Sequence, residues 1–304
     1  MLDVVGVGTN SVDDVIQLGG ELSAVLESSK ARVTSRHVIM GGQTATVTAA
    51  CAALGLRTGY IGAFGSDANG GLARDGLRSR GVDLSHAVVA DAANRGAIIL
   101  VDTAGRRTVL WHRSGHLVVP PDALTPESVA ARIVHLDDDD QQLAMAAVRA
   151  ARAAGAMVTS DIEHAVDRVE ELIRAVTYPI FEQHLPLRLT GERDPERALR
   201  KLRRLNGGTL VMTLAEEGAV ALEGDTFHAA PAYGVKVVDA TGAGDVFRAG
   251  FIYGLLQKWR VREILRFANA TAAVSCTRLG AIPSVPTLDE VLALKKGSPD
   301  PLFT

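Results

Sequence analysis

The sequence predicts an α/β protein with a central, mainly parallel sheet and helices on both of its faces. After Pro120, short apolar β-type runs alternate with longer helical segments, which is the pattern of repeated strand–helix units. Hydrophobic residues make up 47% of the 304 residues and aromatic residues only 4%, so we expect a core of Ala, Val, Leu and Ile. Two β-type runs, 96–101 and 107–112, are separated by turn residues and predict a hairpin outside this alternation.

The N-terminal region predicts one strand of the central sheet followed by short strands and turns. Residues 2–7 are an apolar β-type run that ends in Gly6-Val7-Gly8. Residues 11–40 are expected to form strands and turns rather than a crossover helix. Because Gly6-Val7-Gly8 lacks the third glycine of a dinucleotide fingerprint, a dinucleotide-dependent oxidoreductase is the weakest of the functions considered.

A glycine pair, Gly41-Gly42, precedes an Ala-rich helix that is expected over 47–54. Two neighbouring glycines allow the backbone to approach a ligand closely. A strand then ends at Gly62, and a second helix is expected over about 71–80.

The second half continues the alternation of strands and helices. In chain order, the predicted strands are 133–136, 157–161, 209–214 and 219–222, and the predicted helices are 142–154, 166–175 and 193–205. Ligands of such sheets bind at the carboxyl ends of the strands. Residues 295–304 are expected to be a loose tail.

Charge and hydropathy argue against several classes of partner. The net charge of −3 is not that of a surface that coats nucleic acid. No uncharged run reaches the roughly 18 residues of a membrane helix, and the N-terminus shows no signal-peptide pattern. We therefore expect a cytoplasmic protein with neither nucleic-acid nor membrane partners.

The cysteines and one acidic run are interpreted as structural features. Cys51 and Cys276 each lie in an apolar run of small residues, and we expect buried free thiols rather than a disulfide or a metal site. The acidic run 137–140 follows a predicted strand and is expected to be a solvated loop. A divalent-metal cluster is the alternative for this run.

The stretch 237–256, VVDATGAGDVFRAGFIYGLL, predicts the end of a strand, a turn and a helix. Gly242 and Gly244 flank Ala243 where the helix begins, and the first N–H groups of a helix form an anion site made of backbone. The carboxylate of Asp245 would repel an anion, so we expect it to take a proton from a hydroxyl that attacks a bound phosphate. The alternative is a glycine-rich turn capped by Asp245.

The segment DATGAGD, residues 239–245, resembles the DTxGAGD signature of the ribokinase-like (PfkB) family of carbohydrate kinases, with Ala240 where many members have Thr. A second signature is similar in order and content, with Gly41-Gly42, Leu54-Gly55, Gly62, Gly65, Asp67 and Gly81-Val82-Asp83. The resemblance covers about residues 4–290. It implies a ribokinase-like fold, with a core in 1–10, 41–94 and 114–304 and a small β-sheet lid in 11–40 and 95–113.

For the reaction, the resemblance implies transfer of the γ-phosphoryl group of ATP to a primary hydroxyl of a ketose or related sugar. Asp245 matches the catalytic base of the family. The amides of Gly242, Ala243 and Gly244 match its anion hole.

For the sugar, Asp13 resembles the early substrate-binding Asp of the family, and Gly41 and Gly42 resemble its substrate-contacting glycine pair. Gln43 and Thr46 replace the usual Asn-x-x-Asn, which changes the hydroxyl pattern they read. Two arginines near the predicted hairpin have alternative interpretations. Arg107 contacts the transferring phosphate or is an exposed hairpin charge, and Arg113 contacts an acidic group of the substrate or has no ligand.

For the nucleotide, the segment from Thr213 to Gly218 resembles the T-L-G-x-x-G segment along ATP, with Ala215 in place of the first glycine. Asn269 matches a residue near the adenine, and Gly280 matches the residue that closes the adenine pocket.

Mg²⁺ is expected because ATP chemistry requires it. The usual Asn-x-x-Glu is missing before Leu189-Thr190-Gly191, where Glu182 takes the Asn position and Leu185 the Glu position. We expect Glu182 to act on water ligands of Mg²⁺, or another part of the site to replace the motif. A monovalent cation such as K⁺, which some members hold, is expected near Asp239.

Several alternatives stay open from the sequence. A kinase of the same family that acts on a keto-deoxy sugar acid or a nucleoside is the nearest. A sugar- or nucleotide-binding sensor with weak catalysis comes from another class, and the intact Asp245 argues against it. A homodimer that pairs through the lid is also expected.

Overall fold

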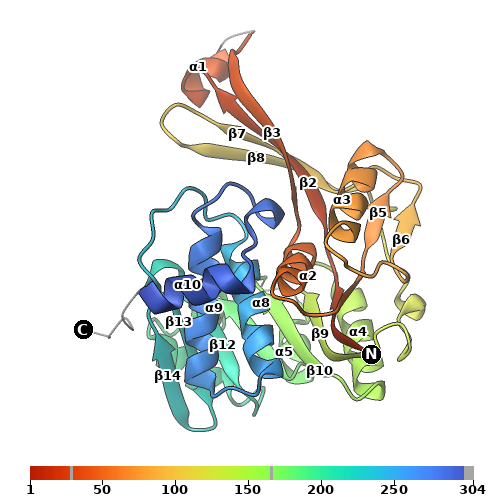
Figure 1. Ribbon diagram of the computed structural model, residues 1–304, viewed down its shortest axis with the longest axis vertical. Coiled ribbons are helices and arrows are strands. Elements are labelled where there is room, and N and C mark those ends of the chain that lie inside the picture. The colour runs from red at the N-terminus through yellow and green to blue at the C-terminus, as the bar shows by residue number, and fades with distance from the viewer. Residues whose placement is uncertain (28–29, 165–166, 298–304) are drawn as a thin grey trace.

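The computed structural model describes residues 1–27, 30–164 and 167–297 of the chain. Its centre is an eight-stranded sheet with the order β14-β13-β12-β11-β10-β9-β1-β4 (Figure 1). The strands from β4 to β12 pair in parallel, and β13 and β14 continue the sheet antiparallel at one edge. The strands are β1 (Leu2–Val7), β4 (Thr58–Ile61), β9 (Ala131–Asp137), β10 (Met157–Ile162), β11 (Tyr178–Glu182), β12 (Leu210–Thr213), β13 (Ala219–Glu223) and β14 (Thr226–Ala230).

Helices cover both faces of this sheet, because neighbouring residues of a strand point to opposite faces. Val4 of β1 belongs to the core of one face, and Val5 belongs to the core of the other. The helices of the first face are α2 (Gln43–Ala53), α8 (Ala243–Leu256), α9 (Val261–Ser275) and α10 (Leu288–Gly297). Those of the second face are α4 (Gln141–Ala153), α5 (Val169–Ala175), α6 (His184–Thr190) and α7 (Pro195–Leu202).

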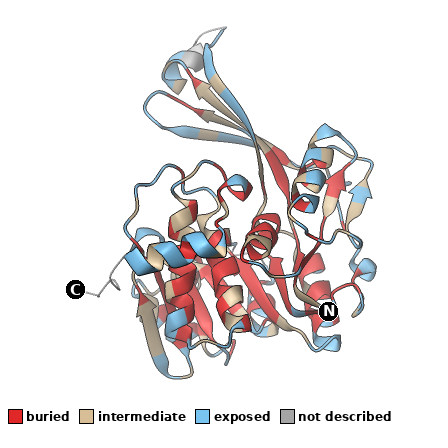
Figure 2. Cartoon of the chain, viewed as in Figure 1, coloured by how far each residue is buried: buried red, intermediate tan, exposed pale blue. Residues whose placement is uncertain are grey.

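A second sheet, called the lid sheet, stands away from the central one (Figure 1). Its order is β3-β2-β7-β8, and its strands are β2 (Ser11–Leu18), β3 (Val33–Gly41), β7 (Gly96–Val101) and β8 (Arg107–His112). The hairpin from β7 to β8 turns at Asp102, whose carboxylate accepts hydrogen bonds from the N–H groups of Ala104 and Arg106, both at 2.9 Å. Figure 2 shows that burial concentrates in the central sheet and its helices rather than in the lid sheet.

The remaining elements lie in the connections between these strands and helices. They are α1 (Leu22–Glu27), β5 (Ala63–Gly65), α3 (Ala68–Arg78), β6 (Val88–Ala90), and the 3-10 turns Pro121–Ala123, Ala215–Glu217 and Ile282–Ser284. Within the ranges given above, no helix combines the length and the apolar character needed to cross a bilayer.

The predicted fold class is confirmed, since the central sheet is mainly parallel, has helices on both faces and is accompanied by a small separate sheet. Strands β11 and β14 and helix α6 have no counterpart among the predicted elements. Pro179 lies within β11 and Pro186 within α6, and a proline weakens the pattern of either element. The short α1 lies where only strands and turns were expected.

Two predicted boundaries meet the edge of the described ranges. The helix expected from residue 166 is α5, which begins at Val169, and residue 166 itself lies outside the described residues. Residues 295–297 complete α10 instead of starting a tail, and 298–304 lie outside the described residues.

The predicted strand end at Val237 and Val238 is wrong. Both side chains are exposed, at 60% and 59%. The backbone at this point pairs with the end of α9, because the N–H groups of Val238 and Asp239 donate to the carbonyl of Cys276 at 2.8 and 3.2 Å. The approach to α8 is therefore a loop held by a helix end.

The two cysteines have different environments. Cys51 is a buried free thiol in α2, as predicted. Cys276 is also a free thiol, but its predicted burial is wrong, because it is only partly buried. Cys276 follows the last residue of α9, where the chain leaves the core.

Candidate active site

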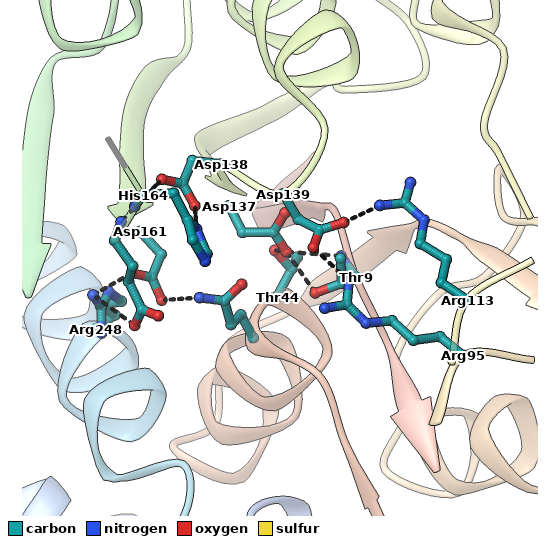
Figure 3. Close-up of polar contacts among 12 residues, drawn as sticks. Thr9, Thr44, Arg95, Arg113, Asp137, Asp138, Asp139, Asp161, His164 and Arg248 are labelled. Carbon is teal, nitrogen blue, oxygen red and sulfur yellow. Dashed lines mark hydrogen bonds and ion pairs between the residues drawn. The ribbon is translucent and has the colours of Figure 1, made fainter. Parts of the chain in front are cut away.

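Two neighbouring strand ends meet the start of α2 at one edge of the central sheet. Asp137 ends β9 and is paired across the sheet with Asp161 of β10. Gln43 donates from Nε2 to Oδ2 of Asp161 at 3.4 Å. Thr44 donates from Oγ1 to Oδ2 of Asp137 at 2.8 Å. Figure 3 shows the two acids side by side at these strand ends, which is where parallel sheets bind ligands.

Helix α8 begins directly after Gly242, which has φ 78° and ψ 4°. A Cβ atom at this position would lie 2.7 Å from the Cβ of Ala281, so only glycine fits the turn. The N–H of Ala243 donates to the carbonyl of Ala240 at 3.1 Å, so this predicted anion-hole amide also closes the turn. Gly244 follows in the first turn of α8, where the backbone N–H groups of a helix have no hydrogen-bond partner within the helix.

Asp245 is the third residue of α8 and is partly exposed. Burial raises the pKa of its carboxyl group well above the usual value, and Arg248, one turn later, opposes that shift. The carboxylates of Glu163 and Asp137 raise the pKa further, and Asp161 lies within hydrogen-bonding reach. A carboxylate with a raised pKa binds a proton more strongly, which suits a general base.

The prediction of a solvated loop at 137–140 is wrong for its first two residues. Asp137 is buried and accepts hydrogen bonds from both N and Oγ1 of Thr9 at 2.8 Å. Asp138 is also buried and accepts from the N–H of His164 at 2.8 Å while its second oxygen pairs with Nδ1 of the same ring. Across the part of the chain that the structure describes, no group of three or more His, Cys, Asp or Glu side chains is arranged to hold a metal ion.

A pocket lies beside Asp137, at the base of the lid sheet. Arg95 precedes β7 and Arg113 follows β8, and both line the pocket. Nη1 of Arg95 lies 2.7 Å from Oδ1 of Asp139, and Arg113 pairs with the other oxygen of that carboxylate. Arg113 also lies 3.9 Å from Oδ2 of Asp140. In Figure 3 both arginines extend toward Asp139.

The predicted sugar-contacting residues adjoin the start of α8. Asp13 is half-buried in β2, and its Oδ1 accepts a hydrogen bond from the N–H of Ala97 at 2.9 Å. A Cβ atom on Gly41 would lie 3.5 Å from Oδ2 of Asp13 and 3.9 Å from the Cβ of Ala281. Since Ala281 also lies against Gly242, the lid strands and the predicted anion hole meet here.

The first turn of α2 forms the floor of this meeting point. Gly42 caps the helix with φ 96°, and a Cβ atom there would lie 2.4 Å from the Cα of Asn10. Only glycine lets α2 start this close to the end of β1. Oγ1 of Thr46 is buried and has no hydrogen-bond partner within the described ranges. Its methyl carbon would be 3.5 Å from a Cβ on Gly242, so this hydroxyl is a further candidate for binding substrate.

Arg107 connects the lid sheet to the loop before α8. Its Nη2 lies 3.5 Å from Oδ1 of Asp239. The same carboxylate accepts hydrogen bonds from N and Oγ1 of Thr241, at 3.0 and 2.7 Å, and from the N–H of Gly280 at 2.9 Å. Asp239 therefore holds three segments together, and its two oxygens already have partners.

Three of the predicted nucleotide-contacting residues, Thr213, Gly218 and Asn269, lie toward the antiparallel edge of the sheet, whereas Gly280 lies beside Asp239. Thr213 of β12 is paired across the sheet with Glu182 of β11. Gly218 has φ 102°, and a Cβ atom there would lie 2.3 Å from the carbonyl oxygen of Ala230. Asn269 is buried in α9 and donates from Nδ2 to that carbonyl at 2.7 Å. Packing of α9 against β14 therefore accounts for an Asn in mid-helix.

Ala215 occupies a position that favours glycine. It has φ 49°, in the left-handed region that L-residues with a Cβ rarely adopt. The preceding N–H, of Leu214, donates to the carbonyl of Gly218 at 2.7 Å and closes the loop. The loop keeps a glycine-like backbone although a methyl group replaces the hydrogen.

Sequence patterns did not single out Arg248, nor Arg95 and Glu163 of the same site. Arg248 is 1% exposed and forms an ion pair with the buried Asp161. The available signal was its place in α8, where it is the one charged side chain in the apolar run from Val246 to Leu256.

The profile of the pfkB family carbohydrate kinases matches residues 9–288. The chain is 32% identical over 269 residues to the ATP-dependent ribose-1-phosphate kinase of Halopiger xanaduensis, covering 87% of this chain and 89% of that protein. It is 30% identical to fructokinase-1 of Oryza sativa, covering 85% and 88%. Among solved structures, a putative ribokinase from Agrobacterium tumefaciens superposes with a TM-score of 0.85 at 24% identity, covering 97% and 98%. Arabidopsis thaliana ribokinase complexed with ribose and ATP gives 0.83 at 24%, covering 98% and 99%.

Proposed function

Because the chain belongs to the pfkB family of carbohydrate kinases, we propose that it transfers the γ-phosphoryl group of ATP to a primary hydroxyl of a ketose or related sugar. One observation carries the proposal most directly. Gly41, which adjoins Asp13, and Gly242, in the turn that leads to the base candidate Asp245, both lie against Ala281, so the sugar-side residues meet the start of α8. Relatives named as fructokinase and ribose-1-phosphate kinase support a sugar or sugar derivative as the acceptor.

In the proposed reaction, Asp245 accepts the proton of the attacking hydroxyl as its oxygen bonds to the γ-phosphorus. The bond from that phosphorus to the oxygen bridging it to ADP breaks, and ADP leaves with the electron pair. The N–H groups at 242–244 and the positive end of α8 stabilise the charge on the transferring group. Asp13 accepts hydrogen bonds from other hydroxyls of the sugar, and Arg107 approaches the phosphates from the lid sheet.

The nucleotide is assigned to the edge of the sheet where Thr213, Gly218 and Asn269 lie, with Gly280 closing the adenine pocket. Mg²⁺ accompanies ATP and neutralises phosphate charge. One oxygen of Glu182 accepts the N–H of His184 at 2.8 Å, and the side chain is 34% exposed, so its free lone pairs can accept hydrogen bonds from metal-bound water. We do not propose a monovalent cation at Asp239, because both of its oxygens accept hydrogen bonds and Arg107 supplies the positive charge there.

The pocket lined by Arg95 and Arg113 favours one second candidate, an acceptor that carries an acidic group, such as a keto-deoxy sugar acid or a sugar phosphate. Two guanidinium groups share the carboxylate of Asp139 at the base of the lid sheet. An anionic group of the substrate can replace Asp139 as their partner. A nucleoside is less favoured, because aromatic residues are scarce and Trp111 of the lid sheet is 75% exposed.

An acceptor panel tests these alternatives and the weakly catalytic sensor together. ADP formation is measured with fructose, ribose, ribose 1-phosphate, a 2-keto-3-deoxy sugar acid and adenosine, each with ATP and Mg²⁺. We expect acceptor-dependent ADP formation with a sugar or an anionic sugar. If only anionic acceptors react, replacing Arg113 by Ala should raise their KM and leave the kcat largely unchanged. Sugar or nucleotide binding without turnover for any acceptor would instead support the sensor.

We also propose that two copies pair through the lid sheet. Val38, Ile98 and Leu110 lie in one row across the sheet, since Asp14 pairs with both Val38 and Ile98 and Ile98 pairs with Leu110. These three apolar side chains are 48%, 41% and 54% exposed. Burial of such a row against a second copy removes apolar surface from water.

Sedimentation velocity checks the dimer. We expect the native chain to sediment as a dimer and the Leu110→Lys variant as a monomer, because a buried lysine in the row would lose its hydration. Leu292→Lys, at an exposed site on α10, is the matched control and should stay dimeric. A native chain that sediments as a monomer at high concentration contradicts the proposal.

A further inference from the structure

A fully buried arginine lies under the first turn of α8. Arg248 follows Asp245 by one helical turn and is 1% exposed, and it is among the largest side chains that are fully buried. A buried guanidinium is strongly unfavourable unless charges and hydrogen bonds compensate it. The groups around Arg248 must therefore compensate its buried charge.

The partners of Arg248 are acids of the candidate active site. Its Nη2 forms an ion pair with Oδ1 of Asp161, which is itself fully buried, and lies 3.9 Å from Oε1 of Glu163. The second oxygen of Asp161 accepts the hydrogen bond from Gln43. Figure 3 shows the side chain of Arg248 meeting that of Asp161.

The guanidinium also touches the predicted anion hole from below. A Cβ atom on Gly244 would lie 2.8 Å from Nη1 of Arg248, so the glycine leaves room for the charged group. Nε of Arg248 is buried and has no hydrogen-bond partner in the part of the chain described. The charge thus lies between the first-turn amides and the acids on the strand ends.

The groups that face Asp245 are mostly acidic. Asp161 and Glu163 come from β10 and the residues after it, and Asp137 comes from the end of β9. Burial raises the pKa of Asp161 as well as that of Asp245, and Arg248 opposes both shifts. His135, deeper in β9, adds no positive charge, because burial and Arg248 lower its pKa to about 3.

We propose that Arg248 is a positioning residue for the phosphoryl transfer: it fixes the carboxylate of Asp161 and balances the acids of the site, so that Asp245 is ionised before the acceptor hydroxyl binds. The inference rests on the proposed kinase function, in which Asp245 is the base. Without the guanidinium, Asp245 and the three acids that face it would lose the positive charge that opposes their mutual repulsion, and Asp245 would lose its proton only at a higher pH.

The test compares the pH dependence of kcat/KM in the native enzyme and in the Arg248→Lys, Arg248→Met and Asp161→Asn variants. In Arg248→Met we expect the acidic limb to move up by about 1–3 pH units, the range that an adjacent opposite charge contributes to a carboxyl group. Arg248→Lys keeps the charge and should stay near the native limb. Asp161→Asn removes the carboxylate that pairs with Arg248, so the guanidinium charge acts more fully on Asp245 and the limb should move down.

A role in folding alone predicts a different result. In that case Arg248→Met would lower the melting temperature, while the folded fraction would show the native acidic limb, and the proposal would be overturned. An unchanged acidic limb in Asp161→Asn would also overturn the proposal. The proposal can therefore be tested even if Arg248→Met folds poorly.

A second measurement does not depend on turnover. The 13Cγ resonances of labelled aspartates are titrated in the native protein, with Asp245 assigned from its Asn variant. The inference requires Asp245 to be ionised at neutral pH and to lose its proton only at higher pH in Arg248→Met. A protonated Asp245 at neutral pH in the native protein overturns it. If no acceptor is phosphorylated at all, the proposed function fails, and this titration still decides the role of Arg248.

Discussion

Replacing Asp245 by Asn is expected to lower kcat by about 10²–10⁴-fold, the contribution typical of a general base. The amide has nearly the shape of the carboxylate but cannot take the proton from the acceptor hydroxyl. Binding should survive, because the turn at Gly242 and the sugar-side residues Asp13 and Gly41 do not depend on this side chain. We therefore expect a loss in kcat with little change in the affinity for ATP, measured by calorimetry alongside steady-state kinetics.

Stability distinguishes the loss of a base from the loss of the fold. The pKa of Asp245 is higher in the folded chain than in the unfolded chain. As the pH rises from the unfolded-state pKa through the folded-state pKa, ionisation of Asp245 therefore lowers the free energy of unfolding. Asn removes that cost, and the variant should melt at the same or a higher temperature at neutral pH. Asp225→Asn, at a side chain that is 94% exposed, is the matched control and should keep full activity. An Asp245→Asn variant that turns over at the native rate would falsify the assignment of the base.

The second large effect is expected for Gly242→Ala. The added methyl group would lie 2.7 Å from the Cβ of Ala281 on a backbone with φ 78°, so the turn before α8 must shift. Displacing the first-turn amides removes donors from the transferring phosphoryl group, and loss of one such donor lowers kcat by about 10²–10³-fold. The strained backbone should also lower the free energy of unfolding by about 1–3 kcal/mol.

Gly155→Ala separates these two effects. Gly155 has φ 72°, close to that of Gly242, but a Cβ atom there meets nothing within 4 Å. It follows α4, away from the strand ends that form the site. Chemical denaturation should show a loss of stability in both variants, while kinetics should show a loss of kcat only in Gly242→Ala. Equal kcat values in the two variants would mean that the turn contributes strain and no catalytic donor.

The fold was accessible from the sequence because its signals are local. Alternating apolar runs and turn residues predicted the parallel sheet, its helices and the hairpin at 96–112. The prolines at 179 and 186 concealed β11 and α6 because proline weakens the pattern of either element. At Val237 and Val238 the error had another cause: an apolar pair resembles a strand, and only the distant end of α9 shows that this backbone pairs with a helix.

The site was accessible in part, for a similar reason. The segment from Asp239 to Asp245 carries its chemistry in consecutive residues, so its pattern could be identified. Asp137 and Asp161 lie on different strands and come together only through the register of β9 and β10. Arg248 is buried against Asp161, which lies on a distant strand, so its role could not be predicted from the α8 sequence alone. Contacts between distant parts of the chain are not encoded in either segment alone.

In the proposed reaction, the contact between Arg107 and Asp239 would link the binding of the sugar to the binding of the nucleotide. Asp239 is held at once by the lid strand β8, by the turn that starts α8 and by Gly280. If a bound sugar shifts the lid sheet, it would therefore also shift the amides that are proposed to bind phosphate, and a nucleotide bound at these amides would shift the lid sheet. Such coupling is reciprocal by thermodynamic necessity: whatever factor the sugar adds to the affinity for ATP, ATP adds to the affinity for the sugar.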